Sequence, residues 1–454
     1  MPCTFKRNKR NKKAENALLI NEFGIKKAEM KLLIIGGGFG GLRLARKLNN
    51  RNGFEITLLD KFNYHQFQPL FYQVATAGLD ASNISFPLRK VFHNSRNVRF
   101  HMAEVKQIVS ASNKVITDIG EFDYDVLVIA TGADTNFFGN TLMQENAMPM
   151  KSSVEAIQLR HRILTNFEDA SAATDPLELQ RLMTVVVVGG GPTGVELSGA
   201  IADMRRFVLP KDYPELDFSQ MKIMLLEGSA KTLSVMSEKS SLQSQQYLEK
   251  LGVIVKTNSI LTDYDGKTAA LKDGSKIESA LVIWAAGIKG NILPGIDPAL
   301  IAKGNRIKVN RECLIEGTSN IYAIGDVAYM DTDPEYPHGH PQVAPVAIQH
   351  ADMLVNNLRL IQMKSNADRK ETFVYDDKGA MATVGRKLAV VDVPKPKLHF
   401  GGFLAWLVWM FLHLMLILGV KNRLSVFFNW FYNYFTKDQN LRLIFKVNYK
   451  TRKI

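Results

Sequence analysis

The sequence predicts an α/β protein made of two parallel-sheet units, followed by an apolar carboxy-terminal region. Three observations predict it: a strand pattern followed by a glycine-rich turn and a helix, a second copy of that arrangement, and a late stretch of 21 residues without Asp, Glu, Lys or Arg. With 454 residues, 46% hydrophobic and 22% charged, the chain has the length and composition of a folded protein with more than one domain.

The first arrangement begins at residue 31. Residues 31–35 (KLLII) form an apolar run typical of a buried parallel strand, and a second such run, residues 55–59, ends at Asp60. The turn between them contains the glycines Gly36, Gly38, Gly40 and Gly41. Three of these fit the spacing G-x-G-x-x-G, which lets the backbone approach a pyrophosphate, and the acid is placed to accept a hydrogen bond from a ribose. The segment therefore predicts a dinucleotide-binding turn.

The second arrangement repeats these features. Residues 184–188 (TVVVV) are again apolar, and the strand pattern at 222–226 ends at Glu227. The turn that follows the first of these runs contains Gly189, Gly191 and Gly194. A carboxylate at Glu227 would accept a hydrogen bond from a 2′-hydroxyl and repel a 2′-phosphate, so the sequence favours NADH over NADPH.

Charge is concentrated at the two ends of the chain. Residues 1–29 contain eight Lys and Arg against three Glu, and residues 384–454 contain twelve against two Asp, which leaves residues 30–383 at about −2 of the total of +13. This distribution suits an anionic membrane surface better than nucleic acid, so no nucleic-acid partner is expected. Residues 1–29 are interpreted as a basic extension, with a start at Met30 as the alternative, and no secretory signal is expected.

Cysteine use limits the redox chemistry. Cys3 and Cys313 are the two cysteines of the chain, and no C-x-x-C motif occurs. A disulfide scaffold is therefore not expected and a reducing compartment is. No metal site is predicted, because the histidines have no ligand spacing with cysteines.

Three shorter strand patterns complete the fold prediction, at residues 126–132, 281–287 and 321–326, the last of which ends in Gly-Asp. In this order they resemble the two-dinucleotide-binding flavoprotein superfamily. The resemblance implies two Rossmann-like domains: an FAD domain at residues 30–150 and 295–385, interrupted by an NADH domain at residues 151–294.

A closer resemblance is to the type II, non-proton-pumping NADH:quinone oxidoreductases. Residues 62–78 (FNYHQFQPLFYQVATAG), 189–196 (GGGPTGVE), 284–289 (WAAGIK) and 342–350 (QVAPVAIQH) carry it, within a similarity that covers roughly residues 30 to 440. Disulfide reductases and sulfide:quinone reductases share the glycine turns but use paired cysteines, so both are disfavoured. The family implies FAD, NADH, a quinone acceptor and attachment to a membrane, in an electron-transport role without proton pumping.

The resemblance also implies site residues. For FAD it implies Gly36, Gly38, Gly40, Gly41, Asp60, Gln68, Thr131, Gly132, Gly325, Asp326 and Ala347. For NADH it implies Gly189, Gly191, Gly194, Glu196, Glu227, Ala286 and Gly287. Many family members have Ala-Gln-x-Ala-x-Gln-Gln where this chain has Ala344–His350, so Pro345 and His350 depart from the pattern and Gln349 keeps it. Glu196, Gln349 and His350 are the predicted catalytic residues, with Glu196 helping to protonate the reduced quinone.

The carboxy-terminal region, residues 386–454, is predicted to associate with membrane lipids. The uncharged stretch is residues 400–420, and cations flank it on both sides, which fits a single span poorly under the positive-inside rule. Residues 424–435 place seven aromatic side chains among Asn and Ser, a pattern typical of a helix that lies in the membrane interface. A monotopic anchor is therefore expected, with a spanning helix and a soluble core helix or homodimer interface as alternatives. The expected location is the cytoplasmic face of a bacterial inner membrane rather than the mitochondrial inner membrane.

Two other functions stay open at the level of sequence. One is a related FAD-dependent NADH reductase whose acceptor is a soluble electron-transfer protein. The other is a non-catalytic, NADH-sensing membrane adaptor that uses the same fold.

Overall fold

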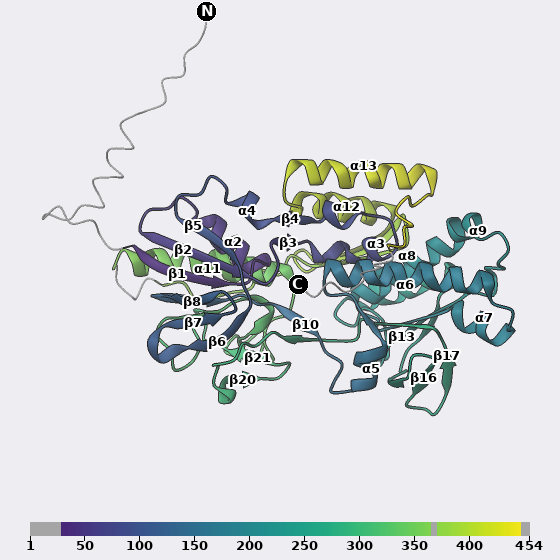
Figure 1. Ribbon diagram of the computed structural model, residues 1–454, viewed down its shortest axis with the longest axis horizontal. Helices are drawn as coiled ribbons and strands as arrows, with labels where there is room; N and C mark the ends of the chain where they lie inside the picture. The colour runs from purple at the N-terminus through teal and green to yellow at the C-terminus, as the bar shows by residue number, and fades with distance from the viewer. Residues whose placement is uncertain (1–28, 365–369, 446–454) are drawn as a thin grey trace, which may run out of the picture. The chain divides into compact units, whose positions relative to one another are not determined.

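The computed structural model describes residues 29–364 and 370–445, which form two compact units (Figure 1). The first unit contains residues 29–65, 87–133, 290–364 and 370–375, and the second contains residues 66–86, 134–289 and 376–445. The basic extension predicted over residues 1–29, including Cys3, lies outside the described residues apart from Glu29.

The first unit is built on a five-stranded parallel sheet. Its strand order is β22-β9-β1-β2-β5, with β1 at Met30–Ile35, β2 at Phe54–Asp60, β5 at Val98–Met102, β9 at Val126–Ile129 and β22 at Ile321–Ala323. Helices α2 (Phe39–Leu48) and α11 (Ala344–Gln362) pack against each other beside this sheet. Arg43 of α2 joins them by a two-point ion pair with Asp352 of α11, at 2.7 and 2.9 Å.

Smaller elements complete the first unit. They are α4 (Leu88–Val91), the antiparallel strands β6 (Val105–Val109), β7 (Lys114–Thr117) and β8 (Gly120–Asp123), and the strands β20 (Ile301–Ala302), β21 (Arg306–Lys308) and β23 (Ala328–Tyr329), with the short 3-10 turn η5 at Gly325–Val327. Short strands lie where the chain passes from one unit to the other: β3 (Tyr64–Gln66), β4 (Ser85–Pro87), β10 (Ala133–Thr135) and β19 (Ile288–Gly290).

The second unit repeats the parallel sheet. Its order is β11-β18-β12-β13-β14, with β11 at Met148–Pro149, β12 at Thr184–Val188, β13 at Lys222–Leu226, β14 at Ile254–Lys256 and β18 at Leu281–Trp284. The antiparallel strands β15 (Leu261–Tyr264), β16 (Thr268–Leu271) and β17 (Lys276–Glu278) lie beside it. Side chains from β12, β13 and β18 form one hydrophobic core with side chains from β15 and β16.

The helices of the second unit pack on its strands or on one another. They are α3 (Phe71–Ala75), α5 (Thr141–Asn146), α6 (Ser153–Ala172), α7 (Pro176–Leu182), α8 (Pro192–Phe207), α9 (Leu209–Asp212) and α10 (Glu238–Lys250). Capping is local: Ser152 accepts from the N–H of Glu155, and Ser237 accepts from the N–H of Ser240.

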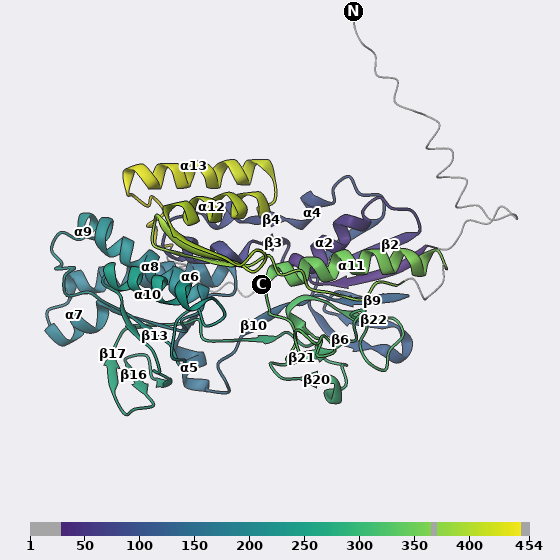
Figure 2. The ribbon, with the colours of Figure 1, turned by 180° about the vertical axis from the view of Figure 1, so that it is seen from behind.

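The carboxy-terminal residues add three more layers to the second unit. The antiparallel strands β24 (Ala380–Val384), β25 (Leu388–Val393) and β26 (Leu398–Gly402) pack on α8 and α10, and α12 (Phe403–Leu416) packs on those strands. The yellow helix α13 (Val420–Thr436) lies over α12, as both views show (Figures 1 and 2). Among the described residues, no helix has both the length and the apolar character needed to cross a membrane.

The uncharged stretch at 400–420 is not one continuous helix. Its first residues belong to β26, α12 covers 14 residues, and a turn then leads to α13. The breaks occur at Gly402 and Gly419, which have φ of +84° and +80°, a conformation that glycine adopts without the steric cost of a side chain. Apolar composition alone could not predict these two breaks.

The compact units also differ from the predicted domain boundaries. Residues 66–86, which were assigned to the FAD domain, lie in the second unit, because α3 packs on α6 and α8. The carboxy-terminal region lies in the second unit as well, because β24 packs on α8. The predicted α/β class with two parallel sheets is confirmed.

Helix α8 lies so close to the end of β24 that one added methyl group should disturb their packing. A Cβ at Gly199 of α8 would lie 2.5 Å from the backbone nitrogen of Gly385, so Gly199→Ala should push the two elements apart. We expect it to lower the free energy of unfolding by about 1–3 kcal/mol. Urea unfolding followed by circular dichroism measures this, with Gln246→Ala at an exposed position of α10 as the control. Equal stability of both variants would contradict the packing described.

Candidate functional site

The first glycine turn joins β1 to α2 in a tightly determined geometry. A Cβ at Gly41 would lie 1.9 Å from the carbonyl oxygen of Gly36, so the first turn of α2 fits against the strand end only without a side chain there. The N–H of Gly37 donates to Asp60 Oδ2 at 2.6 Å, and Asp60 Oδ1 accepts from the N–H of Phe62 at 2.7 Å. Burial raises the pKa of Asp60, and these two N–H groups oppose that effect.

The second glycine turn joins β12 to α8 and repeats this geometry. A Cβ at Gly194 would lie 1.9 Å from the carbonyl oxygen of Gly189. Glu227, directly after β13, accepts from the N–H of Gly190 at 2.6 Å and from the N–H of Ser229 at 2.6 Å. Each strand-end acid therefore binds the glycine turn of its own unit, and the predicted ribose contacts of Asp60 and Glu227 stay predictions.

Both turns have the features that a bound pyrophosphate requires. A Cβ at Gly38 or at Gly191 would meet no atom within 4 Å, so space is open beside each turn. These two glycines precede α2 and α8 and have no side chain to cap them, so the positive end of each helix dipole faces this open space. The residues present thus fit one dinucleotide at each turn.

The other predicted FAD residues lie at several places. Thr131 donates from its hydroxyl to the carbonyl of Asn291 at 2.6 Å, and Gly132 follows it. A Cβ at Gly325 would lie 3.0 Å from that of Ala347, which places η5 against α11, and the carbonyl of Asp326 accepts from Gln342 at 3.1 Å. Gln68 is exposed and lies in the second unit, where it accepts from Lys151 Nζ at 3.2 Å.

The remaining predicted NADH residues follow β18. Ala286 is exposed, and a Cβ at Gly287 would lie 2.9 Å from the Phe138 ring. A Cβ at Gly189 would lie 2.5 Å from the carbonyl oxygen of Ala285, so this strand end contacts the glycine turn directly.

His350, one of the predicted catalytic residues, is 1% exposed on α11. Its Nδ1 accepts from the N–H of Gly325 at 3.1 Å, so its proton is on Nε2, which is buried without a partner among the described residues. Burial, with smaller contributions from His340 and Arg306, lowers the pKa of His350 to about 3, so the ring is neutral. Gln349, its neighbour, is half-buried.

Glu196 lies in the second turn of α8 and is 8% exposed. Its Oε1 accepts from Thr383 of β24, from the backbone N–H at 3.2 Å and from the hydroxyl at 3.4 Å. Burial raises the pKa of Glu196 to about 8, and the contacts with Thr383 oppose this rise. The Trp409 indole N–H is close enough to favour the ionised carboxylate, although it makes no hydrogen bond of ordinary geometry.

A chain of polar contacts continues from Thr383. The hydroxyls of Thr383 and Tyr72 are 3.0 Å apart, Gln73 Nε2 donates to the Tyr72 hydroxyl at 2.9 Å, and Trp430 Nε1 donates to Gln73 Oε1 at 2.6 Å. Burial and the nearby Glu196 raise the pKa of Tyr72. The sequence analysis did not single out these four residues. Tyr72 and Gln73 lie inside the segment 62–78 that carries the family resemblance, which is the only signal that could have found them.

No group of three or more His, Cys, Asp or Glu that could hold a metal occurs in residues 29–364 and 370–445. Cys313 is a buried free thiol whose pKa is raised by burial.

Comparison with known proteins decides the family. Residues 30–351 match the model of the pyridine nucleotide-disulphide oxidoreductases, and residues 378–437 match that of the NDH2 C-terminal domain. The type II NADH:quinone oxidoreductase Ndh of Mycobacterium tuberculosis is 35% identical over 413 residues, which cover 88% of this chain and 87% of that protein. The chain belongs to the type II NADH:quinone oxidoreductases.

Other relatives and solved structures are more distant in sequence. The Staphylococcus aureus enzyme is 28% identical over 368 residues, covering 78% of this chain and 87% of that protein. The structure of NDH2 from Plasmodium falciparum in complex with NADH has a TM-score of 0.83 at 22% identity and covers 92% of this chain and all of that one. The sulfide:quinone oxidoreductase of Aquifex aeolicus has a TM-score of 0.66 at 18% identity, covering 90% of this chain and 96% of that one.

Membership of the type II NADH:quinone oxidoreductases confirms the predicted reaction class. The predictions of an oxidoreductase, of FAD and NADH as its dinucleotides and of a quinone as electron acceptor are confirmed. The α/β dinucleotide-binding fold is confirmed as well. The residue assignments stay predictions.

The buried carboxyl of Glu196 predicts a pH-dependent stability. Its pKa is raised from the ordinary 4.5 to about 8, so the folded state keeps a proton that the unfolded state releases over that interval. Its contribution to the free energy of unfolding therefore falls as pH rises from about 5 to 8, and is constant above the folded pKa. Glu196→Gln removes this titration. The free energy of unfolding of the variant, compared with that of the parent, should therefore rise across this pH interval by on the order of 2–4 kcal/mol.

Urea unfolding at a series of pH values measures the effect. Asp203, whose pKa burial raises to about 6, is present in both proteins, and its contribution cancels in the difference. Parallel stability curves for parent and variant would contradict the environment described for Glu196.

Proposed function

We propose that NADH binds at the second glycine turn, that FAD is held at the first, and that the quinone arrives from a membrane to which the carboxy-terminal helices attach. The observation that supports two dinucleotide sites is the repeated geometry of the turns, in which a carboxylate oxygen lies 2.6 Å from the backbone nitrogen of Gly37 and of Gly190. The assignment of FAD to the first turn and NADH to the second follows the family resemblance. FAD at the first turn would supply the chemistry that accepts a hydride from NADH and passes two electrons to a quinone.

The residues at each turn would divide the work of binding. Gly36–Gly41 and Asp60 would hold the pyrophosphate and the ribose of FAD, with Thr131, Gly132, Gly325 and Asp326 beside them. Gly189–Gly194, Ala286 and Gly287 would hold NADH, and Glu227 would accept from its 2′-hydroxyl. A 2′-phosphate at Glu227 would be repelled, which supports selectivity for NADH.

Glu196 would handle protons for quinone reduction, which consumes two of them. A carboxyl with a pKa of about 8 is protonated at neutral pH and can act as a general acid. The hydroxyls of Tyr72 and Thr383 lie in series with it, and Gln73 donates to Tyr72, so each hydroxyl can donate towards the carboxylate. We infer that Thr383, held by its contact with Tyr72, orients the Glu196 carboxyl and stabilises its ionised form after it has given up a proton.

His350 would act by positioning rather than by touching the quinone. Its buried Nδ1 accepts from the N–H of Gly325, in the turn whose neighbour Asp326 is expected to contact the flavin. Since the position departs from the family glutamine, we propose that the neutral imidazole replaces that amide as an acceptor for the turn. Gln349, which keeps the family residue, remains the proposed quinone contact.

Attachment to a membrane is supported by the surface of α12 and α13. Thirteen large apolar side chains on these helices are 38–72% exposed: Phe403, Leu404, Phe411, Leu412, Met415, Leu416, Val420, Leu424, Phe427, Phe428, Phe431, Tyr432 and Phe435. The opposite side of α13 is bound to the protein, since Val426 and Trp430 are buried and Asn422 donates to carbonyls near residue 83. An aromatic outer face on a helix fixed along its inner face fits a monotopic anchor in one leaflet.

The location follows from this anchor. A basic carboxy-terminal region suits an anionic leaflet, and we propose the cytoplasmic face of a bacterial inner membrane. A homodimer that covers part of the apolar face is compatible with the same surface.

Paired substitutions test the two nucleotide sites. Asp60→Asn should weaken FAD binding and Glu227→Gln should raise the KM for NADH, each about tenfold, because an amide nitrogen would face a backbone N–H in place of an acceptor. Titration of the purified enzyme with NADH, followed by a short-chain quinone, gives flavin content and KM together. Each variant is the control for the other. Loss of FAD in Glu227→Gln would contradict the assignment. So would full flavin content in Asp60→Asn or an unchanged KM for NADH in Glu227→Gln.

The hydroxyl groups of Tyr72 and Thr383 beside Glu196 lead to a separate prediction. Tyr72→Phe and Thr383→Val should each lower kcat for quinone reduction about tenfold and change its pH profile, because the ionised form of Glu196 loses hydroxyl contacts that orient and stabilise it. The rate at which NADH bleaches the flavin should not change. Tyr213→Phe is the matched control, because its buried hydroxyl donates to Glu168 at 2.8 Å in the same unit. Equal losses in both half-reactions would indicate a structural effect instead.

A further inference from the structure

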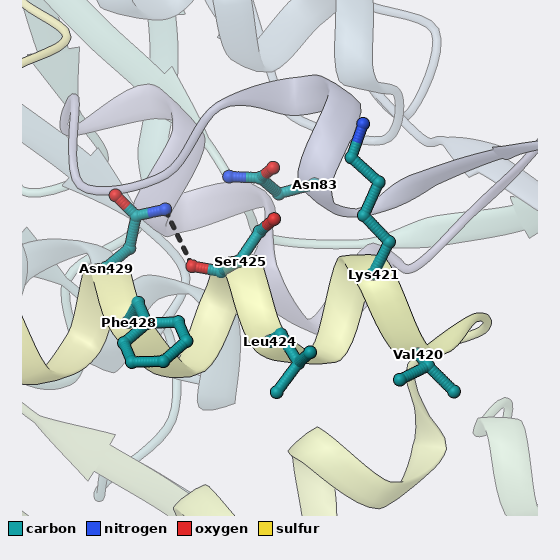
Figure 3. Close-up of a pocket in the computed structure, with 7 residues that line it drawn as sticks. All are labelled: Asn83, Val420, Lys421, Leu424, Ser425, Phe428 and Asn429. Carbon is teal, nitrogen blue, oxygen red and sulfur yellow. Dashed lines mark hydrogen bonds between the residues drawn. The ribbon is translucent and has the colours of Figure 1, made fainter.

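An open groove lies on the second unit between α13 and the 3-10 turn η2 (Ala81–Asn83), with a volume of about 720 Å³ (Figure 3). The residues that line it are Asn83, Val420, Lys421, Leu424, Ser425, Phe428 and Asn429. None of these is acidic, and none has a role in the reaction proposed above. The groove therefore needs an explanation of its own.

The groove has two chemically different walls. Lys421, Ser425 and Asn429 recur every four residues and lie on the side of α13 that faces Asn83 (Figure 3). The neighbouring row of α13 is apolar and belongs to the exposed face: Val420, Leu424 and Phe428 are 72%, 51% and 62% exposed. A ligand that fills the groove must therefore combine a polar end with an apolar length.

The charge of Lys421 indicates that the polar end of the ligand is an anion. Lys421 forms no ion pair with any residue in the part of the chain that the structure describes, so its ammonium is available to an anion. Asn83 and Ser425 add an amide and a hydroxyl group beside it, which suit phosphate oxygens, while Asn429 Nδ2 donates to the carbonyl of Ser425 at 2.8 Å. A quinone headgroup is neutral and would leave the ammonium without a counter-charge.

The groove also has a fixed geometry. Asn422, next to Lys421, donates to the carbonyls of Ser82, Asn83 and Ser85 at 3.1–3.3 Å, which holds η2 against α13. Arg423 donates to the carbonyls of Ile417 and Met415 at 2.8 Å and closes the turn from α12. The walls are therefore formed before any ligand arrives, which lowers the entropic cost of binding.

We propose that this groove binds one anionic phospholipid, with its phosphate at Lys421 and Asn83 and an acyl chain along Leu424 and Phe428. The proposal rests on the membrane attachment proposed above, because the apolar row is continuous with the exposed face of α12 and α13. The site differs from general attraction of a basic region to anionic lipids, since it depends on one particular lysine.

Native mass spectrometry of the detergent-purified holoenzyme tests the site, with phosphatidylglycerol and phosphatidylcholine as probes. We expect one tightly retained phosphatidylglycerol and no comparable phosphatidylcholine. Lys421→Gln should weaken retention about tenfold, and Lys421→Arg should preserve it. Lys397→Gln, an exposed lysine before β26, removes the same charge elsewhere and should have no effect. All three variants should oxidise NADH with a short-chain quinone at the parental rate.

Equal losses in Lys421→Gln and Lys397→Gln, or equal retention of both lipids, would overturn the site. So would retention of a long-chain quinone that depends on Lys421, or competition by glycerol 3-phosphate as strong as by the lipid. Co-sedimentation with vesicles of phosphatidylcholine, with and without phosphatidylglycerol, separates the two levels of the argument. Binding to both vesicles without a Lys421-dependent preference would overturn the site alone. Binding to neither would overturn the membrane attachment together with it.

Discussion

The close approach of a glycine turn to the helix that follows it is the constraint on which both units depend. In each unit the Cβ that a side chain would need lies 1.9 Å from the carbonyl oxygen of the first glycine, at Gly41 and at Gly194. The helix can then start directly beside the strand, with its N–H groups towards open space. The acid of the neighbouring strand binds the same turn through a backbone N–H, at Asp60 and at Glu227. A side chain at either glycine would separate these parts.

Features of this kind were predictable because they are local. The glycine spacing, the apolar strands and the strand-end acids all lie within about one βαβ unit, and steric rules relate them directly to a geometry. The surroundings of Glu196 were not predictable in the same way. Thr383 and Tyr72 come from segments far apart in the chain, and their meeting depends on how β24 and α3 pack on α8. The burial of His350 was also not predictable from the local sequence, because it depends on how α11 packs against η5.

In the carboxy-terminal region, apolar composition does not predict which secondary-structure elements form. An apolar stretch at 400–420 indicated contact with lipid, while the two glycines that divide it, Gly402 and Gly419, determine a short strand, a short helix and a turn. Polar residues then fix α13 at both ends. Asn422 binds η2, and Arg386 donates to the carbonyls of Asn433 and Tyr434 at 3.2 and 2.8 Å while its guanidinium lies over the Tyr434 ring. These contacts hold the aromatic face outward.

Helix α8 connects these features within the second unit. Its amino-terminal end forms the second glycine turn, its second turn carries Glu196, and its middle contacts β24 at Gly199. The carboxy-terminal layers therefore also contribute to the surroundings of Glu196, because β24 supplies the Thr383 contacts to Glu196 and α13 supplies the Trp430 contact to Gln73. A carboxyl buried this deeply is stable only where such donors reach it or where it keeps its proton. The layers that present an apolar face to solvent thus also determine the protonation state of Glu196.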